Sequence, residues 1–237
     1  MEGKKMKEKK FDKITAERKK KVLHAAAKMF LEKGYTESTV REISRVSGVE
    51  KTAMIRAFGG KENILAELVK YVLEGQFSFT AKFLEGKTED KILFYAAETT
   101  LQLYMAESNE SIRNLYSVAY SMPNTSEIIQ NTITAKLEEI FKKHLPKLKR
   151  DDFYELEIAS GGIMRSFMIL PCNQSFTMER KVARFIETTL LIYRVPDEKI
   201  KETIEFVSQF DYPMLAQTAI NHMLSYLEQV EKVYEEQ

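Results

Sequence analysis

The side chains between residues 41 and 61 that could do chemistry are hydrogen-bond donors rather than nucleophiles or metal ligands. Arg41, Lys51, Thr52 and Arg56 bring guanidinium, ammonium and hydroxyl groups together in a short stretch of chain. Such groups donate to phosphate oxygens and to the base edges in the major groove of DNA. This chemistry is recognition, provided that the chain places these side chains on one surface.

Two short helices joined at Gly48 are predicted to form that surface. Thr39 and Glu42 make a T-x-x-E capping box, which satisfies backbone amides at a helix N-terminus and so sets where the first helix begins. Gly48 can adopt the left-handed conformation that ends this helix and turns the chain. The apolar residues of the first helix recur at helical spacing and are predicted to face inward: Val40, Ile43 and Val46.

The second short helix follows the turn and is predicted to have one buried and one exposed side. The side that can pack on the first helix contains Val49, Ala53, Met54 and Phe58. The outward side contains Lys51, Thr52, Ile55 and Arg56. Two such helices with a polar, basic outer surface are the outline of a helix-turn-helix unit.

Basic residues are concentrated in the same part of the chain. Residues 1–61 contain 17 Lys and Arg against 8 Asp and Glu, a net charge of +9, whereas residues 62–237 contain 19 against 27, a net charge of −8. Basic runs alone are usually solvated surface. Their coincidence with the helix-turn-helix pattern instead favours contact with a phosphate backbone.

Over about residues 14–70 the chain resembles the tetracycline-repressor (TetR) family of bacterial transcription regulators. The resemblance lies in a helix from Ile14 to Lys33 closed by Gly34-Tyr35, then Thr39, Ile43, Gly48-Val49, Phe58 and Gly60-Lys61-Glu62 in the family's register. It implies a homodimeric, ligand-responsive repressor that binds a palindromic operator in double-stranded DNA. It also implies that Lys61 holds a phosphate and that the DNA is faced by Arg41, Lys51, Thr52, Ala53 and Arg56.

Ile55 departs from the family pattern, which usually has a tyrosine whose hydroxyl contacts the DNA backbone at this position. Ile55 can supply only an apolar contact to DNA, such as one to a thymine methyl group. Ser44 and Ser47 also replace the commoner alanines of the family and are expected to pack similarly.

The remainder of the chain is predicted to be helical. Helices are expected at about residues 61–85, 88–107, 109–121, 125–144, 151–170, 177–194, 197–209 and 212–234, with no segment that alternates like a strand. The chain has 237 residues and 44% hydrophobic content, so we expect an all-α protein with two domains. These are a DNA-binding domain with a basic N-terminal arm at 1–60 and a ligand-binding and dimerisation domain at 61–237. In the family, the helix that begins the second domain transmits ligand binding to the DNA-binding heads.

Other function classes find less support. The sequence has no Ser/His/Asp set, no metal-ligand spacing and no phosphate-binding glycine loop, so we expect neither catalysis, a cofactor nor a metal. Cys172 and the three histidines are expected to be structural. An all-helical enzyme remains one alternative and a membrane-surface protein another, although the first helix lacks the large apolar face that membrane anchoring needs. Without an 18-residue apolar run or a signal-peptide pattern, the expected location is the cytoplasm.

Two helices, near residues 152–170 and 177–194, look too apolar for a solvated surface, and Gly161-Gly162 would allow another backbone to approach closely. In the family the corresponding pair forms the dimer as a four-helix bundle, which is the preferred interpretation here. The same two helices could instead be the central helices of the monomer. A third alternative is a dimer through the apolar stripe of the last helix, which includes Leu215, Ala219, Ile220, Met223, Leu224, Leu227 and Val230.

A pocket for a small, largely apolar ligand is predicted from bulky aromatic and methionine side chains. The candidates are Tyr95, Tyr104, Met105, Tyr116, Tyr120, Met164, Arg165, Phe167 and Met168. Aromatic and methionine residues at helical spacing are more often ordinary core. Arg165 interrupts an apolar helix, so it is expected to be buried and to pair with a carboxylate of the protein or of an acidic ligand.

Overall fold

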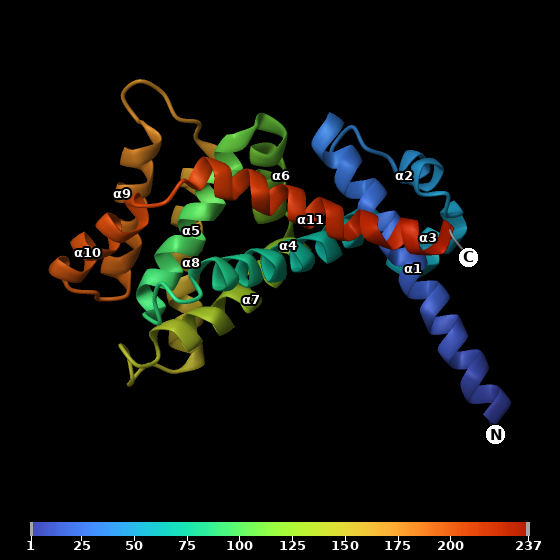
Figure 1. The fold of residues 1–237 in the computed structure, drawn as a ribbon, viewed down its shortest axis with the longest axis horizontal. Helices are drawn as coiled ribbons and strands as arrows, with labels where there is room; N and C mark the ends of the chain where they lie inside the picture. Colours follow the sequence, from blue (N-terminus) through green and yellow to red (C-terminus); the bar gives the residue numbers. More distant parts are fainter. Residues whose placement is uncertain (1, 236–237) are drawn as a thin grey trace. The chain divides into compact units, whose positions relative to one another are not determined.

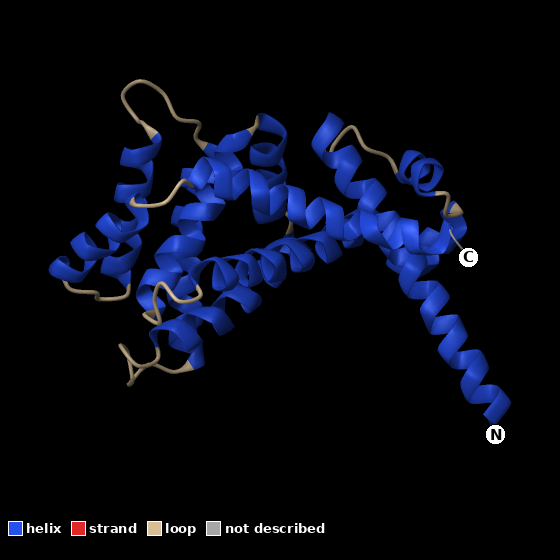
Figure 2. Cartoon of the chain, viewed as in Figure 1, coloured by secondary structure: helices blue, strands red, loops and turns tan. Residues whose placement is uncertain are grey.

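The computed structural model describes the backbone of residues 2–235 and the side chains of residues 16–225. In this part of the chain the regular secondary structure is helical, with loops between the helices and no strand (Figure 2). The helices, labelled in Figure 1, are α1 (Glu2–Lys33), α2 (Val40–Ser47), α3 (Lys51–Phe58), α4 (Lys61–Leu84), α5 (Lys91–Ser108), α6 (Glu110–Ser121), α7 (Pro123–Phe141), α8 (Arg150–Ile169), α9 (Met178–Ile192), α10 (Asp197–Ser208) and α11 (Tyr212–Glu235).

The all-α prediction is confirmed, and the predicted helices after residue 60 lie within a few residues of the observed ones. One prediction was wrong: the first helix was expected to begin at Ile14, but α1 begins at Glu2. The lysine, glutamate and methionine residues before Ile14 are good helix formers, and no proline interrupts them. The basic N-terminal arm is therefore helical along the described backbone.

The chain divides into two compact units, of which the smaller comprises residues up to Leu68 together with those from Asn221 onward. The larger unit is Val69–Ile220, so the division falls within α4 and within α11. The expected boundary after residue 60 stays a prediction of where the DNA-binding function ends.

The smaller unit is built on packing of α1, α2 and α3 against one another. Its core contains side chains that are at most 1% exposed: Phe30, Ile43, Met54, Ile64 and Leu65. Apolar burial from several short helices supplies the stability that two helices of eight residues would lack in isolation.

α5 is the central helix of the larger unit, because α6, α7, α8, α9 and α10 all pack against it (Figure 1). Asp90 caps its N-terminus, because the Asp90 carboxylate accepts a hydrogen bond from the Ile92 amide at 2.8 Å. Tyr95 of α5 then packs edge-on against Phe141 and Tyr193, whose rings stack at a centroid distance of 4.1 Å. This aromatic cluster joins α5 to the ends of α7 and α9.

α8 has two different faces. Side chains recurring at helical spacing are buried on one face: Phe153, Glu157, Ser160, Met164 and Met168. The other face exposes Tyr154, Ile158 and Ile169. The monomer therefore covers only one side of α8, and that side includes a carboxyl group.

Candidate nucleic-acid interface and buried cavity

The start of α2 has the predicted capping box. The Glu42 amide donates to the Thr39 hydroxyl at 3.2 Å, and the Thr39 amide donates to the Glu42 carboxylate at 3.1 Å. Lys33 at the end of α1 also donates to this carboxylate at 2.5 Å. The hydrogen bonds from Lys33 and then Thr39 lower the pKa of Glu42 to about 2. The Glu42 carboxylate therefore caps α2 and also joins α2 to α1.

The turn from α2 to α3 is confirmed as well. Gly48 has a φ of 65° and ends α2 in the left-handed conformation, which residues with a Cβ seldom adopt. The Ser44 hydroxyl donates to the Val49 carbonyl at 2.7 Å, and the Val49 amide donates to the Ser47 hydroxyl at 3.3 Å. Both serines thus hold the turn by hydrogen bonds, a role beyond the alanine-like packing expected of them.

Val46 was predicted to face inward, and this prediction was wrong. Its side chain is 49% exposed, whereas Ile43 is fully buried and Ser47 is 7% exposed. At about 100° per residue, position 47 lies closer than position 46 to the direction of Ile43. The buried stripe of α2 therefore continues through the serine that makes the turn.

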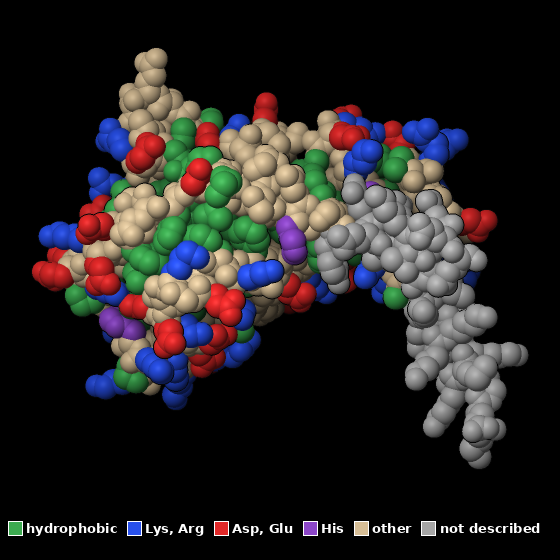
Figure 3. All heavy atoms as spheres, in the orientation of Figure 1, with side chains coloured by type: hydrophobic (Ala, Val, Ile, Leu, Met, Phe, Trp, Pro, Cys, Tyr) green, Lys and Arg blue, Asp and Glu red, His purple; other side chains and the backbone are tan. Residues whose placement is uncertain are grey.

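α3 presents the predicted outer surface. Lys51, Thr52 and Arg56 are exposed, Ile55 is 44% exposed and Ala53 is partly buried. Met54 and Phe58 are buried on the opposite side. Arg41, one residue into α2, is exposed too, so the structure leaves the predicted donors of this unit accessible. By contrast, acidic and basic side chains are interspersed on the face of the larger unit drawn in Figure 3.

Lys61 lies differently from what its predicted phosphate contact requires. Its ammonium donates to the carbonyls of Tyr35 at 2.8 Å, Ser38 at 2.9 Å and Thr36 at 3.4 Å, and it lies 4.1 Å from the centroid of the Tyr35 ring. Burial lowers its pKa. Since an ammonium has three protons, a phosphate would compete with these carbonyls. Lys61 therefore closes the loop after α1, a contact hidden from sequence reasoning because the partners are 23 to 26 residues away.

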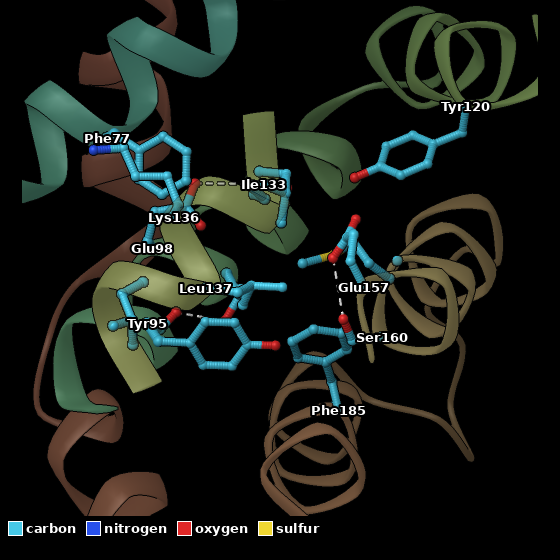
Figure 4. A pocket seen from close by; sticks show the side chains of 15 residues that line it. Phe77, Tyr95, Glu98, Tyr120, Ile133, Lys136, Leu137, Glu157, Ser160 and Phe185 are labelled. Atoms are coloured by element: carbon cyan, nitrogen blue, oxygen red, sulfur yellow. Dashed lines mark hydrogen bonds between the residues drawn. The ribbon is translucent and has the colours of Figure 1, made fainter. Parts of the chain in front are cut away.

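The larger unit contains a small, partly open cavity of about 30 Å³, which has room for water molecules. The lining comes from α4 to α9 and is Phe77, Tyr95, Glu98, Thr99, Gln102, Tyr120, Ile133, Lys136, Leu137, Ile140, Glu157, Ser160, Gly161, Met164 and Phe185 (Figure 4). Three predicted ligand residues are brought together there: Tyr95, Tyr120 and Met164.

The other predicted ligand residues do not line this cavity. Tyr104 stacks on Tyr212 at 5.3 Å, and Phe167 contacts the Phe185 ring at 5.8 Å. Gln76 donates to both the Met105 sulfur and the Tyr116 hydroxyl. Met168 is 1% exposed in the core. For these residues the ordinary core interpretation fits the structure better than the pocket prediction.

The prediction for Arg165 was wrong. Its side chain is exposed, and Nη2 donates to the Ser121 hydroxyl at 3.0 Å. Arg165 follows Met164 by one residue, which places it about 100° around α8 and outside the buried stripe, where its side chain meets solvent. It does not bring a positive charge into the core, and no carboxylate is required to neutralise it there.

Two buried carboxyls were missed by sequence reasoning. Glu98 and Glu157 are each 3% exposed and both line the cavity. Burial raises the pKa of Glu98 to about 7 and that of Glu157 to about 8, because the charged form loses its hydration. The spacing of Glu157 with Phe153, Ser160 and Met164 on one face of α8 was the signal that could have revealed it.

A third buried ionisable group, Lys181 of α9, is 1% exposed and was also missed. Its ammonium is 2.7 Å from the Glu107 carboxylate and donates to the Leu170 carbonyl at 2.5 Å. The other oxygen of Glu107 accepts from the Cys172 amide at 3.0 Å. This pair ties the end of α5 to the segment between α8 and α9.

No helix in the described part of the chain is long and apolar enough to cross a membrane.

Comparison with known proteins identifies the N-terminal region. The sequence profile described as "Bacterial regulatory proteins, tetR family" matches residues 22–68. This segment includes most of α1, all of α2 and α3 and the beginning of α4.

Two relatives extend this result. The HTH-type transcriptional regulator HbdR of Aromatoleum sp. (strain CIB) is 33% identical over 76 residues, which are 32% of this chain and 33% of that protein. The match thus spans about a third of the length of this curated relative. The crystal structure of a TetR-family transcriptional regulator from Syntrophomonas wolfei str. Goettingen shares the fold, with a TM-score of 0.54 at 18% identity over 76% of this chain and 96% of that one. The segment that carries α2 and α3 is therefore similar to the N-terminal region of the tetR family of bacterial regulatory proteins.

Proposed function

We propose that this protein is a transcription repressor that binds a palindromic operator as a homodimer and responds to a small, largely apolar ligand. The observation that carries the proposal is the exposed surface of Arg41, Lys51, Thr52 and Arg56 on a helix-turn-helix unit of the tetR family. A regulator of this kind acts on the chromosome, so we place it in the bacterial cytoplasm.

The first prediction concerns which side chains of this surface contact base edges and which contact only phosphates. Arg41→Ala and Lys51→Ala should each weaken operator binding by roughly 1 to 3 kcal/mol, or about 5- to 150-fold, because either cation can pair with guanine O6 and N7. Duplexes enriched by the protein from a random pool supply the operator. Binding is then measured by fluorescence anisotropy on enriched and scrambled duplexes at several salt concentrations.

Lys201→Ala is the matched control, since Lys201 is an exposed lysine of α10 in the larger unit. It should leave both affinities unchanged. If Arg41→Ala and Lys51→Ala weaken enriched and scrambled duplexes equally, these residues contact only phosphates. Specificity would then rest with Thr52, Ala53, Ile55, Arg56 or DNA shape. If the random pool yields no enriched sequence at all, the regulator proposal itself fails.

The proposed homodimer uses the uncovered sides of α8 and α9, which pack against each other in the monomer. Ile158 of α8 is 51% exposed and Leu191 of α9 is 53% exposed. Gly162 of α8 is exposed as well, and a Cβ built there meets no atom within 4 Å. A second copy bound here would cover the apolar side chains, and two copies related by a two-fold axis match half-sites about 34 Å or a multiple apart.

A charge placed at this face should separate the two copies. Ile158→Lys and Leu191→Lys should convert the dimer to monomer at micromolar concentration, because each would bury an unpaired ammonium in an apolar interface. Native mass spectrometry measures the result. Met214→Lys is the control, since Met214 is 60% exposed on α11, the competing dimer helix. A dimer that survives the first two changes but not the third would place the interface on α11.

A further inference from the structure

The cavity of the larger unit is lined by two carboxyls that no basic group pairs with in the described part of the chain. Glu98 Oε1 accepts a hydrogen bond from Gln102 Nε2 at 2.6 Å, and Glu157 Oε2 accepts one from the Ser160 hydroxyl at 3.1 Å. Within the described part of the chain, neither carboxyl forms an ion pair, and the second oxygen of each accepts no hydrogen bond. Buried carboxyls are normally paired or bound to a ligand, so these two call for a functional explanation.

The basic residue of the cavity wall, Lys136, does not neutralise them. Its ammonium is 3.3 Å from the Glu139 carboxylate and 5.4 Å from the centroid of the Phe77 ring. In Figure 4, Lys136 and Glu98 lie on the side of Phe77, while Glu157 lies on the side of Tyr120. The cavity thus has a carboxyl on each of two sides and a lysine already engaged elsewhere.

The rest of the wall is largely aromatic. Phe77, Tyr95, Tyr120 and Phe185 come from four different helices, and the Tyr120 hydroxyl points toward Glu157 in Figure 4. Aromatic faces attract organic cations through their quadrupole and also bury apolar groups. Buried carboxyls together with aromatic rings suit a ligand that has both a positive charge and apolar groups.

We propose that the cavity lined by Glu98 and Glu157 binds an organic cation with an apolar body, held by these carboxyls and by the surrounding aromatic rings. This inference deepens the proposed function, on which the effector role of the ligand rests. At about 30 Å³ the cavity is far smaller than typical ligand pockets, so the cation must displace wall side chains. Met164 and Lys136 are the long, flexible ones.

Proton balance distinguishes a cation from a neutral ligand. A buried carboxyl that is protonated in the free protein must lose its proton when a permanent cation binds, so that RCOOH and L⁺ become the pair RCOO⁻·L⁺ plus H⁺. Cation affinity should then rise with pH through the pKa values of about 7 and about 8. A neutral ligand that accepts a hydrogen bond from RCOOH would show the opposite trend.

The other titratable groups around the carboxyls do not obscure this range. On the wall these are Tyr95 and Tyr120, and behind it Tyr116 and Tyr193; burial, first of all, raises the pKa of each of these tyrosines. They therefore stay neutral at pH 6 to 9. Lys136 is held by Glu139. Proton release in this range would come from Glu98 and Glu157.

Isothermal titration calorimetry with benzyltrimethylammonium chloride tests the proposal, because the charge of this probe does not titrate. At constant ionic strength its affinity should rise about 100-fold between pH 6.5 and 8.5, as expected when groups with pKa values of about 7 and about 8 both ionise on binding. Buffers of different ionisation enthalpy should show release of roughly one to two protons at the lower pH. The uncharged isostere neopentylbenzene should bind at least ten-fold more weakly.

Glu98→Gln and Glu157→Gln should each lower the affinity at pH 8 by ten-fold or more, whereas Glu155→Gln on the exposed side of α8 should not. The proposal is overturned if the probe does not bind at millimolar concentration, if the isostere binds equally well or if affinity falls as pH rises. Probe binding, the comparison with the isostere and the pH trend are all measured on the unaltered protein. Operator affinity is measured separately, with and without the probe. If the probe binds but leaves operator affinity unchanged, only the effector role is refuted.

Discussion

Glu157→Gln should stabilise the protein by about 4 kcal/mol at pH 8 but by less than about 1 kcal/mol at pH 5. Burial raises the pKa of Glu157 from 4.5 to about 8 in the folded protein. An amide has nearly the shape of a protonated carboxyl but cannot ionise. At pH values where the unfolded chain ionises Glu157, folding of the unaltered protein costs the free energy of keeping this carboxyl protonated. The variant removes that cost.

The sign follows from proton binding. Between about pH 4.5 and about pH 8 the folded state retains a proton on Glu157 that the unfolded chain releases, so the stability of the unaltered protein falls as pH rises. Each unit of pKa difference corresponds to about 1.4 kcal/mol. Denaturant unfolding followed by helical circular dichroism at pH 5 and pH 8 measures the difference between the two proteins.

Glu155→Gln is the matched control on the same helix, because Glu155 is exposed. Its effect should be small and nearly independent of pH. A stabilisation by Glu157→Gln that is equal at pH 5 and pH 8 would show that the carboxyl is already ionised in the folded state at pH 5. A cationic partner would then have to be sought close to it.

Lys181→Met should destabilise the protein by about 3 kcal/mol. Lys181 is 1% exposed, and its removal leaves Oε2 of Glu107 and the Leu170 carbonyl without their donor, while Oε1 of Glu107 keeps the Cys172 amide at 3.0 Å and Arg113 at 3.9 Å. Removing one partner of a buried ion pair is strongly destabilising because the remaining charge has been taken out of water. Glu107 keeps part of its hydration, at 23% exposure, which keeps the effect at the lower end of the usual range.

Arg184→Met on the same helix is the control. Arg184 pairs with Glu187 at 2.6 Å, but the two side chains are 65% and 46% exposed, so its loss should change stability by less than about 1 kcal/mol. The double variant Lys181→Met/Glu107→Gln should recover part of the loss, since no unpaired charge remains. Equal effects of Lys181→Met and Arg184→Met in urea unfolding would contradict the buried-pair interpretation.

The helix-turn-helix unit was predictable because its signals are local. Thr39 and Glu42 are three residues apart, and Gly48 ends a helix through its own backbone conformation. Exposure of Lys51, Thr52 and Arg56 follows from helical periodicity once Met54 and Phe58 are buried. The same kind of signal located the other helices. Pro123, for example, stands at the first position of α7, where a missing amide proton does no harm.

The sequence by itself thus determined the helices, the smaller unit's turn and the side of α3 that meets solvent. Only the tertiary structure decided which charged groups are buried and what they touch. Lys61 meets carbonyls 23 to 26 residues away, and Lys181 meets Glu107 across 74 residues. Arg165 and Glu157 lie on the same helix, yet one is exposed and the other buried. Caps and periodicity act over about one helical turn, whereas desolvation and ion pairing depend on which distant helices pack together.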